Sequence, residues 1–259
     1  RMSAPEHPPL LVERDGPIAV LTMNMPERRN ALGVPMRAAI AEALEDLEAD
    51  RAIRAAVITG ASGTFCSGGD LTGMEVDGLD AARERMRRTH KMVRLMVSSR
   101  LPLIAAVEGW CVGAGVSILC ACDHAVAAKD ALFRTPFARV GLIPDLGLLH
   151  TLPRRVGHGR AREMLLFAET MDARRAHEIG LVDRLCAPGE ALAEANTRAR
   201  VLAELAPLSL ALTKAALAGG LEEALAQERE LQAALFMTAD HAEGKRAFLE
   251  KRAPVFRGN

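Results

Sequence analysis

One stretch of the chain combines a short apolar run, a turn of small residues and a second apolar run. Residues 103–107 have the length and composition of a buried strand, and Gly113-Ala114-Gly115 leads into residues 116–122, which have the character of a buried helix start. Such a turn leaves free backbone N–H groups at a helix N-terminus, where they can hold an anion or stabilise an oxyanion. A turn that merely packs a helix on a strand explains the same residues equally well.

Other patterns that carry chemistry are weaker. The five cysteines have no regular spacing, and most stand among apolar residues, which is typical of reduced, buried thiols in a reducing compartment. Cys120 and Cys122 form a C-x-C without a second pair, so no metal site is expected. The G-x-G at 113–115 is no dinucleotide fingerprint, because its third glycine would fall at Ile118.

The charge balance argues against several classes of partner. The chain has 33 basic and 33 acidic side chains, 3% aromatic residues and no tyrosine. Neither nucleic acid nor an anionic membrane surface is therefore expected as a partner. No segment approaches the roughly 20 apolar residues of a membrane span, and no signal peptide is visible, so we expect a cytoplasmic protein.

The elements that must position the turn alternate between strands and helices. Strands are predicted at 10–13 and 18–23, joined by Asp15-Gly16, and at 55–59, 103–107 and 124–127. Helices are predicted at 36–49 and 79–99, where the basic face of the second is interpreted as solvated. After residue 153 the pattern predicts helices at about 157–168, 172–179, 189–206, 207–218, 221–239 and 242–252, with a strand-like interruption at 181–183.

The predicted fold class is therefore α/β over residues 10–150, followed by an α-helical C-terminal third. We expect a disordered or extended N-terminus over 1–9, an α/β core over 10–200 and a helical C-terminal region over 201–259. Strands that recur after helices imply right-handed crossovers.

Four segments together carry a family resemblance. MPERRNAL (25–32), ITGASGTFCSGGDL (58–71), EGWCVGAG (108–115) and EGKRAFLEKRAPVF (243–256) stand in the order and spacing of the crotonase (enoyl-CoA hydratase/isomerase) superfamily, which the chain resembles over residues 10–256. The resemblance implies a spiral of β-β-α units, a C-terminal region that forms a homotrimer or a dimer of trimers, and an acyl-CoA thioester as substrate. It implies no metal and no cofactor, because coenzyme A is part of the substrate.

The resemblance also implies site residues. The backbone N–H groups of Gly69 and Ala114 would hold the thioester oxygen as it becomes an enolate. Contacts with coenzyme A or the acyl group are expected from Arg29, Ala31, Leu32, Asp70, Leu71, Met74, Trp110, Phe137, Phe248 and Lys251. Of these, Phe248 and Lys251 would reach a coenzyme A bound with a neighbouring subunit, although Lys251 could equally be a solvated helix residue. Asp70 is also expected to cap the turn that follows it.

The chain departs from the hydratases of this family at two positions. Where they carry two glutamates that activate water, it has Ser117 and Phe137. General acid–base groups contribute about 10²–10⁴-fold each, so their loss predicts little hydration by the usual mechanism.

Asp145, in GLIPDLG (141–147), stands where some isomerases of the family carry a catalytic acid, among them dienoyl-CoA isomerases and the ring-epoxide isomerase of phenylacetate breakdown. Its apolar neighbours would raise its pKa if the fold buries them together. A structural role, as a cap of the next helix or in the Pro-Asp turn, is the alternative.

Three functions follow from the resemblance. The favoured one is an enoyl-CoA isomerase that moves a double bond or rearranges a ring, with Asp145 as the proton carrier. The alternatives are an enoyl-CoA hydratase with an unusual acid–base set and a non-catalytic coenzyme A-binding paralogue.

Overall fold

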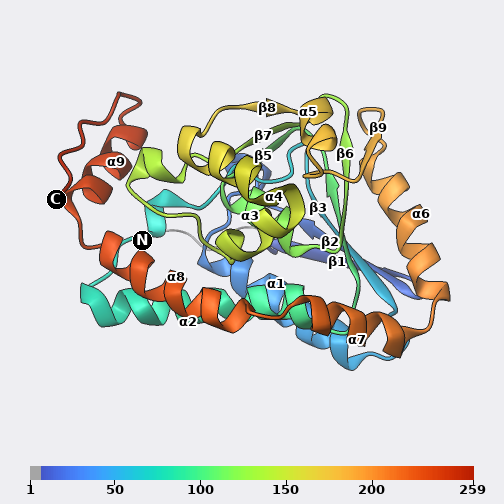
Figure 1. Ribbon diagram of the computed structural model, residues 1–259. Coiled ribbons are helices and arrows are strands. Elements are labelled where there is room, and N and C mark those ends of the chain that lie inside the picture. The colour runs from blue at the N-terminus through green and yellow to red at the C-terminus, as the bar shows by residue number, and fades with distance from the viewer. Residues whose placement is uncertain (1–6) are drawn as a thin grey trace.

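A six-stranded sheet runs through the computed structural model, which describes residues 7–259 (Figure 1). Its strands lie in the order β1-β2-β3-β4-β6-β9, with β1 and β2 antiparallel and all other neighbours parallel. Their bounds are β1 Leu10–Asp15, β2 Ile18–Met23, β3 Ala55–Gly60, β4 Leu103–Val107, β6 His124–Ala128 and β9 Arg184–Cys186. The predicted hairpin and buried strands are confirmed. The expectation for residues 1–9 falls mostly on 1–6, which lie outside the described residues.

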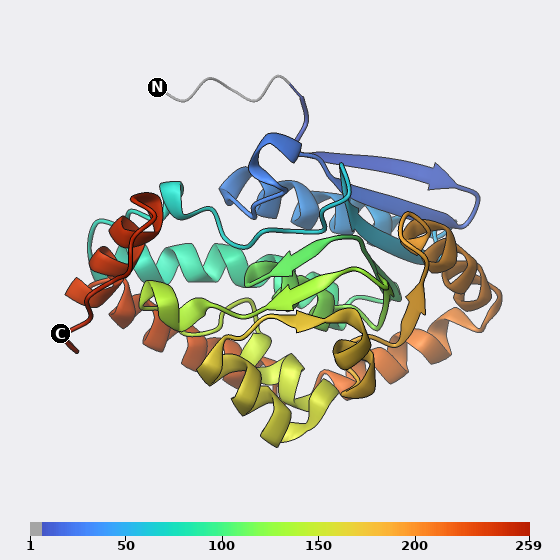
Figure 2. The ribbon, with the colours of Figure 1, turned by 90° about the horizontal axis from the view of Figure 1, so that it is seen from above.

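A second, three-stranded sheet consists of β5 Trp110–Val112, β7 Leu132–Arg134 and β8 Met171–Asp172 (Figure 2). The sequence pattern predicts none of these strands, because each has only two or three residues and is defined by its pairing rather than by local periodicity. In the units β4–β5–α3 and β6–β7–α4, the first strand joins the large sheet and the second joins the small one. The predicted α/β class, with its β-β-α units and helical C-terminal region, is confirmed.

The helices cover the larger sheet unequally. One face is covered by α6, whose alanines at four-residue spacing pack on apolar side chains of β2, β3, β4 and β6. The other face belongs to the main core, to which α1, α2, α3 and α4 contribute. The bounds of the helices are α1 Val34–Ala49, α2 Gly78–Ser98, α3 Ala114–Ala121, α4 Leu148–Phe167, α5 Ala173–Glu178, α6 Ala191–Glu204, α7 Pro207–Leu217, α8 Leu221–Leu235 and α9 Ala239–Leu249.

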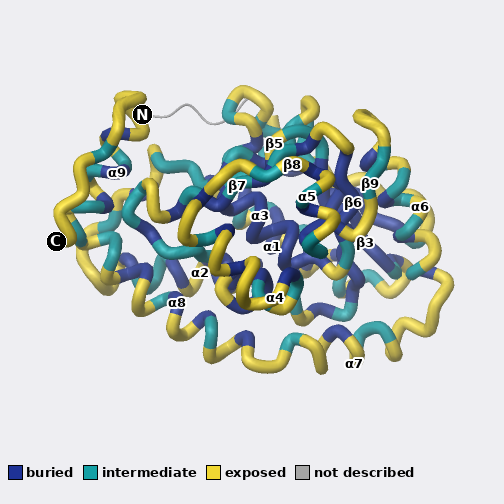
Figure 3. Tube along the Cα trace, turned by 45° about the horizontal axis from the view of Figure 1, so that its top comes forward, coloured by how far each residue is buried: buried dark blue, intermediate teal, exposed yellow. Residues whose placement is uncertain are grey.

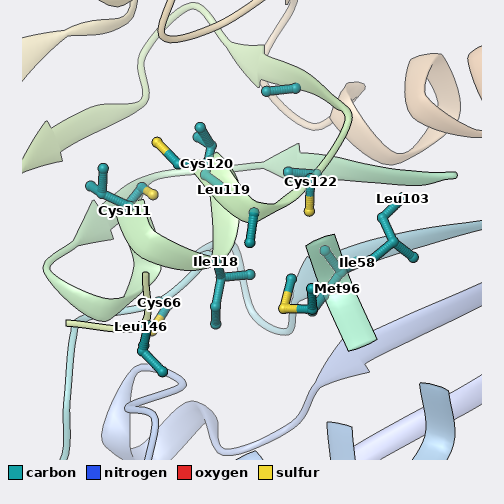
Figure 4. Packing of buried hydrophobic residues seen from close by; sticks show 14 of the residues in the cluster. Ile58, Cys66, Met96, Leu103, Cys111, Ile118, Leu119, Cys120, Cys122 and Leu146 are labelled. Carbon is teal, nitrogen blue, oxygen red and sulfur yellow. The ribbon is translucent and has the colours of Figure 1, made fainter. Parts of the chain in front are cut away.

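Helix α3 is the most deeply placed helix, with all eight of its residues buried (Figure 3). Figure 4 shows Ile118, Leu119 and Cys120 from this helix in the same cluster as Cys66 and Cys111. Because its sequence has no charged side chain, the helix can be surrounded on all sides. The cysteines of the described chain are free thiols, and all but Cys186 are buried, as the sequence predicts.

Two predicted boundaries are wrong. Helix α4 begins at Leu148 rather than near residue 157, and it kinks at Gly157, which has φ 79° and ψ 155°. The strand after α5 is β9 rather than residues 181–183. Asp183 instead forms two hydrogen bonds with Ala125 in β6: its N–H donates to the Ala125 carbonyl (2.9 Å), and its carboxylate accepts the Ala125 N–H (2.7 Å). None of the described helices combines the length and apolar character needed to cross a membrane.

Candidate active site

A cavity of about 500 Å³ opens beside the N-terminus of α3 and brings most of the expected site residues together. Gly69, Ala114 and Asp145 all line it. Of the expected substrate contacts, the lining includes Leu32, Leu71, Met74, Trp110, Phe137 and Phe248. Arg29, Ala31, Asp70 and Lys251 do not line it, so their predicted contacts with coenzyme A stay predictions.

The backbone N–H groups of Gly69 and Ala114 are free to bind a ligand, because neither donates a hydrogen bond to another described residue. The two turns that carry them are joined by backbone pairing. The Cys66 N–H donates to the Trp110 carbonyl (3.0 Å), and the Val112 N–H donates to the Cys66 carbonyl (2.9 Å). The strand β5 thus fixes one amide relative to the other, as an oxyanion hole requires.

The turn that precedes α1 is tied to the Gly69 side of the cavity. The Leu32 N–H donates to the Gly68 carbonyl (2.8 Å), and Arg28 forms an ion pair of 2.9 Å with Asp70. Asp70 also accepts the Thr72 N–H (3.0 Å) and so caps the short helical turn that follows, as predicted. The segments 25–32 and 58–71 therefore form one connected wall of the cavity.

Asp145 lies in the loop before α4, and α8 holds this loop from outside the α/β core. The Gly147 N–H donates to Glu228 Oε2 (2.8 Å), while Glu228 Oε1 lies 2.9 Å from His90 Nε2 of α2. Gln232, one turn further along α8, accepts the Ile143 N–H (3.1 Å) and donates to the Ile143 carbonyl (3.3 Å). Both ends of the loop are therefore fixed by buried side chains of one helix.

The alternative that Asp145 caps the next helix is not supported by the geometry. The residue at the N-cap of α4 is Gly147, and no side chain caps this helix. The carboxyl group of Asp145 forms no hydrogen bond or ion pair with another described side chain, and it faces the cavity instead. Only its backbone carbonyl serves the helix, by accepting the Leu148 N–H (3.2 Å).

The surroundings of Asp145 hold its pKa near neutrality. Burial raises the pKa of its carboxyl group from 3.8 to about 7, and the negative charge of Glu228 acts in the same direction. The guanidinium groups of Arg37 and Arg85 oppose this shift. A carboxyl group with this pKa can both accept and return a proton near pH 7.

At the two positions where the resemblance places the glutamates of hydratases, this chain has no acid or base. Ser117 is fully buried, and its hydroxyl donates to the Gly113 carbonyl (3.4 Å). Phe137 lines the cavity with an apolar ring. Among the described residues that line the cavity, Asp145 is the only carboxylic acid, and none is a histidine, cysteine or lysine.

Sequence reasoning misses Arg37, and its prediction that Arg85 is solvated is wrong. Arg37 lines the cavity from α1, although it heads an apolar stripe that continues through Ile40 and Leu44. The basic face of α2 is solvated as predicted at Arg87 and Arg88, but Arg85 is half-buried. The Arg85 guanidinium donates to the carbonyl of Gly73 (2.8 Å) and acts on the charge of Asp145, so it belongs to the surroundings of the site.

The comparison with protein families agrees with this geometry. The model of the enoyl-CoA hydratase/isomerase family matches residues 13–259. The chain belongs to this family. Proteins of the family act on acyl-CoA thioesters.

Relatives named as hydratases and as isomerases have similar sequence identity to this chain. A 2,3-dehydroadipyl-CoA hydratase from Escherichia coli K12 is 37% identical over 96% of the chain and 98% of the relative. A 1,2-epoxyphenylacetyl-CoA isomerase from the same organism is 36% identical over 93% and 95%. The crystal structure of an enoyl-CoA hydratase/isomerase from Pseudoalteromonas atlantica T6c has a TM-score of 0.85 at 33% identity, over 96% of the chain and all of that structure. Hydratase names are the more frequent among such relatives.

Proposed function

We propose that the protein is an enoyl-CoA isomerase that works through a thioester enolate. The observation that carries this proposal is that Asp145, the single carboxylic acid among the described lining residues, shares the cavity with two free backbone amides. One acid that removes a proton and returns it at another carbon is sufficient for isomerisation, whereas hydration in this family uses two glutamates at positions that are Ser117 and Phe137 here.

The proposed reaction begins with the ionised form of Asp145. Its carboxylate removes a proton from C2 of a 3-enoyl-CoA, and the electron pair of the broken C–H bond moves onto the thioester oxygen. The N–H groups of Gly69 and Ala114 hold the resulting dienolate, and removal of one such donor typically lowers turnover about 10²–10³-fold. The protonated Asp145 then delivers its proton to C4, which gives the conjugated 2-enoyl-CoA and restores the carboxylate.

A hydratase is the second candidate, because hydratase names predominate among similar proteins. In that reaction Asp145 would have to activate water and supply a proton to the adjacent carbon without a second acid. A non-catalytic coenzyme A-binding paralogue is the third.

We also propose that the subunits assemble as a homotrimer or a dimer of trimers through the C-terminal helices. In such an assembly, Phe248 and Lys251 would lie at the coenzyme A of a neighbouring subunit. The exposure of Phe248, 62%, leaves its ring available for such a contact.

Proton NMR in D₂O, with a 3-enoyl-CoA and separately a 2-enoyl-CoA, tests the reaction. We expect the wild type to convert the 3-enoyl substrate to the conjugated isomer. Asp145→Asn should reduce this rate by at least about a hundredfold, because the amide cannot accept the proton. Asp80→Asn is the matched control, since Asp80 has a side-chain exposure of 99% and lies outside the cavity lining.

The other outcomes separate the candidates. Addition of water to the 2-enoyl substrate at a rate that Asp145→Asn leaves unchanged would establish a hydratase with a different acid–base group. Binding of both substrates without any turnover would identify the non-catalytic paralogue.

A further inference from the structure

Arg37 presents a buried guanidinium group whose donors are largely unused. It belongs to the first turns of α1, and its side chain lines both the active-site cavity and a second hollow of about 610 Å³ between α1 and α2. One terminal nitrogen donates to Thr89 Oγ1 (2.8 Å). Its Nε is buried without any hydrogen-bond partner, and its other terminal nitrogen forms no hydrogen bond with a described residue. A buried donor without a partner, such as this Nε, requires an explanation, and an acceptor on a bound ligand supplies one.

The charge of Arg37 is not matched by a bonded carboxylate. Burial lowers its pKa to about 10, and the positive charge of Arg85 acts in the same direction, so Arg37 remains charged near pH 7. Asp70, which lies on the same side, is already bonded to Arg28 and Thr72. Asp145 forms no ion pair with Arg37, and because the pKa of its carboxyl group is about 7, it is only partly ionised near pH 7. Two guanidinium groups therefore act on this part of the cavity with no carboxylate bound to Arg37.

We infer that Arg37, supported by the charge of Arg85, binds a carboxylate at the far end of the acyl chain, so that the preferred substrates are acyl-CoA thioesters of dicarboxylic acids. The inference rests on the acyl-CoA activity proposed above. Gly69, Ala114, Asp145 and Arg37 line the same cavity, so we place the end of a chain held at its thioester by the two amides against Arg37. A planar guanidinium with free N–H groups matches the two oxygens of a carboxylate, and burial strengthens such a bond.

The test compares two saturated ligands of equal length, hexanoyl-CoA and hexanedioyl-CoA, by isothermal titration calorimetry. These ligands differ in their terminal group and contain no double bond, so their binding is independent of isomerisation. We expect the wild type to bind hexanedioyl-CoA at least about tenfold more tightly, as a charge-assisted hydrogen-bonded pair provides. Arg37→Met should abolish this preference, and Arg85→Met should reduce it.

Arg87→Met, an exposed arginine on the same helix as Arg85, is the matched control and should keep the preference of the wild type. Equal affinities in the wild type would overturn the inference, as would a preference that survives Arg37→Met. If Arg37→Met does not fold, as judged by thermal unfolding, Arg85→Met must lower the preference for the inference to stand. A wild type that discriminates between the ligands but fails the NMR assay would refute the isomerase proposal alone.

Discussion

Asp145 lies among opposing charges, and their balance with burial sets the pKa of its carboxyl group. Burial and the carboxylate of Glu228 raise its pKa, whereas Arg37 and Arg85 lower it. Without the arginines the pKa of the carboxyl group would be higher, and less of the carboxylate that the proposed reaction needs would be present near pH 7. Without the burial it would ionise readily but return its proton poorly.

The balance at Asp145 predicts how activity depends on pH. For isomerisation, kcat/KM should rise with pH through about 7, because only the ionised Asp145 removes the first proton. Glu228→Gln removes a negative charge that raises the pKa of Asp145, so the rise should move to lower pH. A pH–rate profile of the NMR-monitored reaction measures the shift. Glu230→Gln, on the exposed side of α8, is the control, and an unchanged or opposite shift in Glu228→Gln would contradict the assignment.

The sequence is informative about Asp145 but silent about the residues that tune it. The residues beside Asp145 in the sequence are apolar, so the sequence itself predicts that burial raises the pKa of its carboxyl group. The charges of Arg37 and Glu228 come from distant segments, and their proximity depends on the packing of α2 against α1 and α8. One signal is present in the sequence: each of Arg37, His90 and Glu228 interrupts an apolar stripe of its helix, where a polar side chain must have a buried partner or a function.

Among the elements, the contact of α3 with the segment of Cys66 determines how the N–H groups of Gly69 and Ala114, the proposed oxyanion donors, are placed relative to each other. A Cβ atom at Gly115 would lie 2.9 Å from the Cys66 carbonyl oxygen and 3.0 Å from its Cβ atom. Only glycine therefore lets the first turn of α3 approach this backbone. Since Ala114 immediately precedes this contact, the position of its N–H depends on it.

Gly115→Ala should consequently disturb both stability and catalysis. The added methyl group must push α3 away from Cys66, which should lower the free energy of unfolding by about 1–3 kcal/mol. The displaced Ala114 donor should reduce kcat by up to about a hundredfold. Denaturant unfolding and the isomerisation assay measure the two effects. Gly159→Ala is the control, because nothing lies within 4 Å of its Cβ position in α4; equal effects at both sites would disprove the argument.

Prediction of the elements succeeds where the pattern is local. The buried strands of the large sheet and the amphipathic helices α1 and α2 follow from apolar runs and helical periodicity. Strand β5 escapes prediction because it is short and its first residue, Trp110, is exposed. It is nevertheless the strand that joins the turns of Gly69 and Ala114, through hydrogen bonds to Cys66 that no local pattern encodes.

At the scale of the molecule, the C-terminal region exposes an unusual amount of apolar surface. Leu208 and Leu212, one turn apart on α7, are both 71% exposed, and Leu217 at the end of this helix is 74% exposed. Figure 3 shows α7 as a largely exposed helix along the edge of the subunit. Contiguous apolar surface of this kind marks an interface, which supports the proposed assembly.

The assembly can be tested with charged substitutions on α7. We expect light scattering to give the mass of a trimer or hexamer for the wild type. Leu208→Asp combined with Leu212→Asp should give smaller species, because buried unpaired carboxylates destabilise an interface. Val34→Asp, at an exposed apolar residue of α1, should leave the mass unchanged. A monomeric wild type, or an unaltered mass of the double variant, would contradict the prediction.

The hydrogen bonds between α8 and the Asp145 loop place the carboxyl group on a different part of the fold from the two free amides. In the proposed reaction, the amides that would hold the thioester oxygen belong to the backbone of the α/β core, whereas the loop of the carboxyl group that would move protons is held by α8, a helix that follows that core. If the proposed reaction holds, we expect substitutions in the loop and in α8 to alter the proton transfers and to leave the thioester contacts in place. Under this proposal, residues 143–147 and their partners on α8 are the positions at which we expect relatives that catalyse different reactions on coenzyme A thioesters to differ.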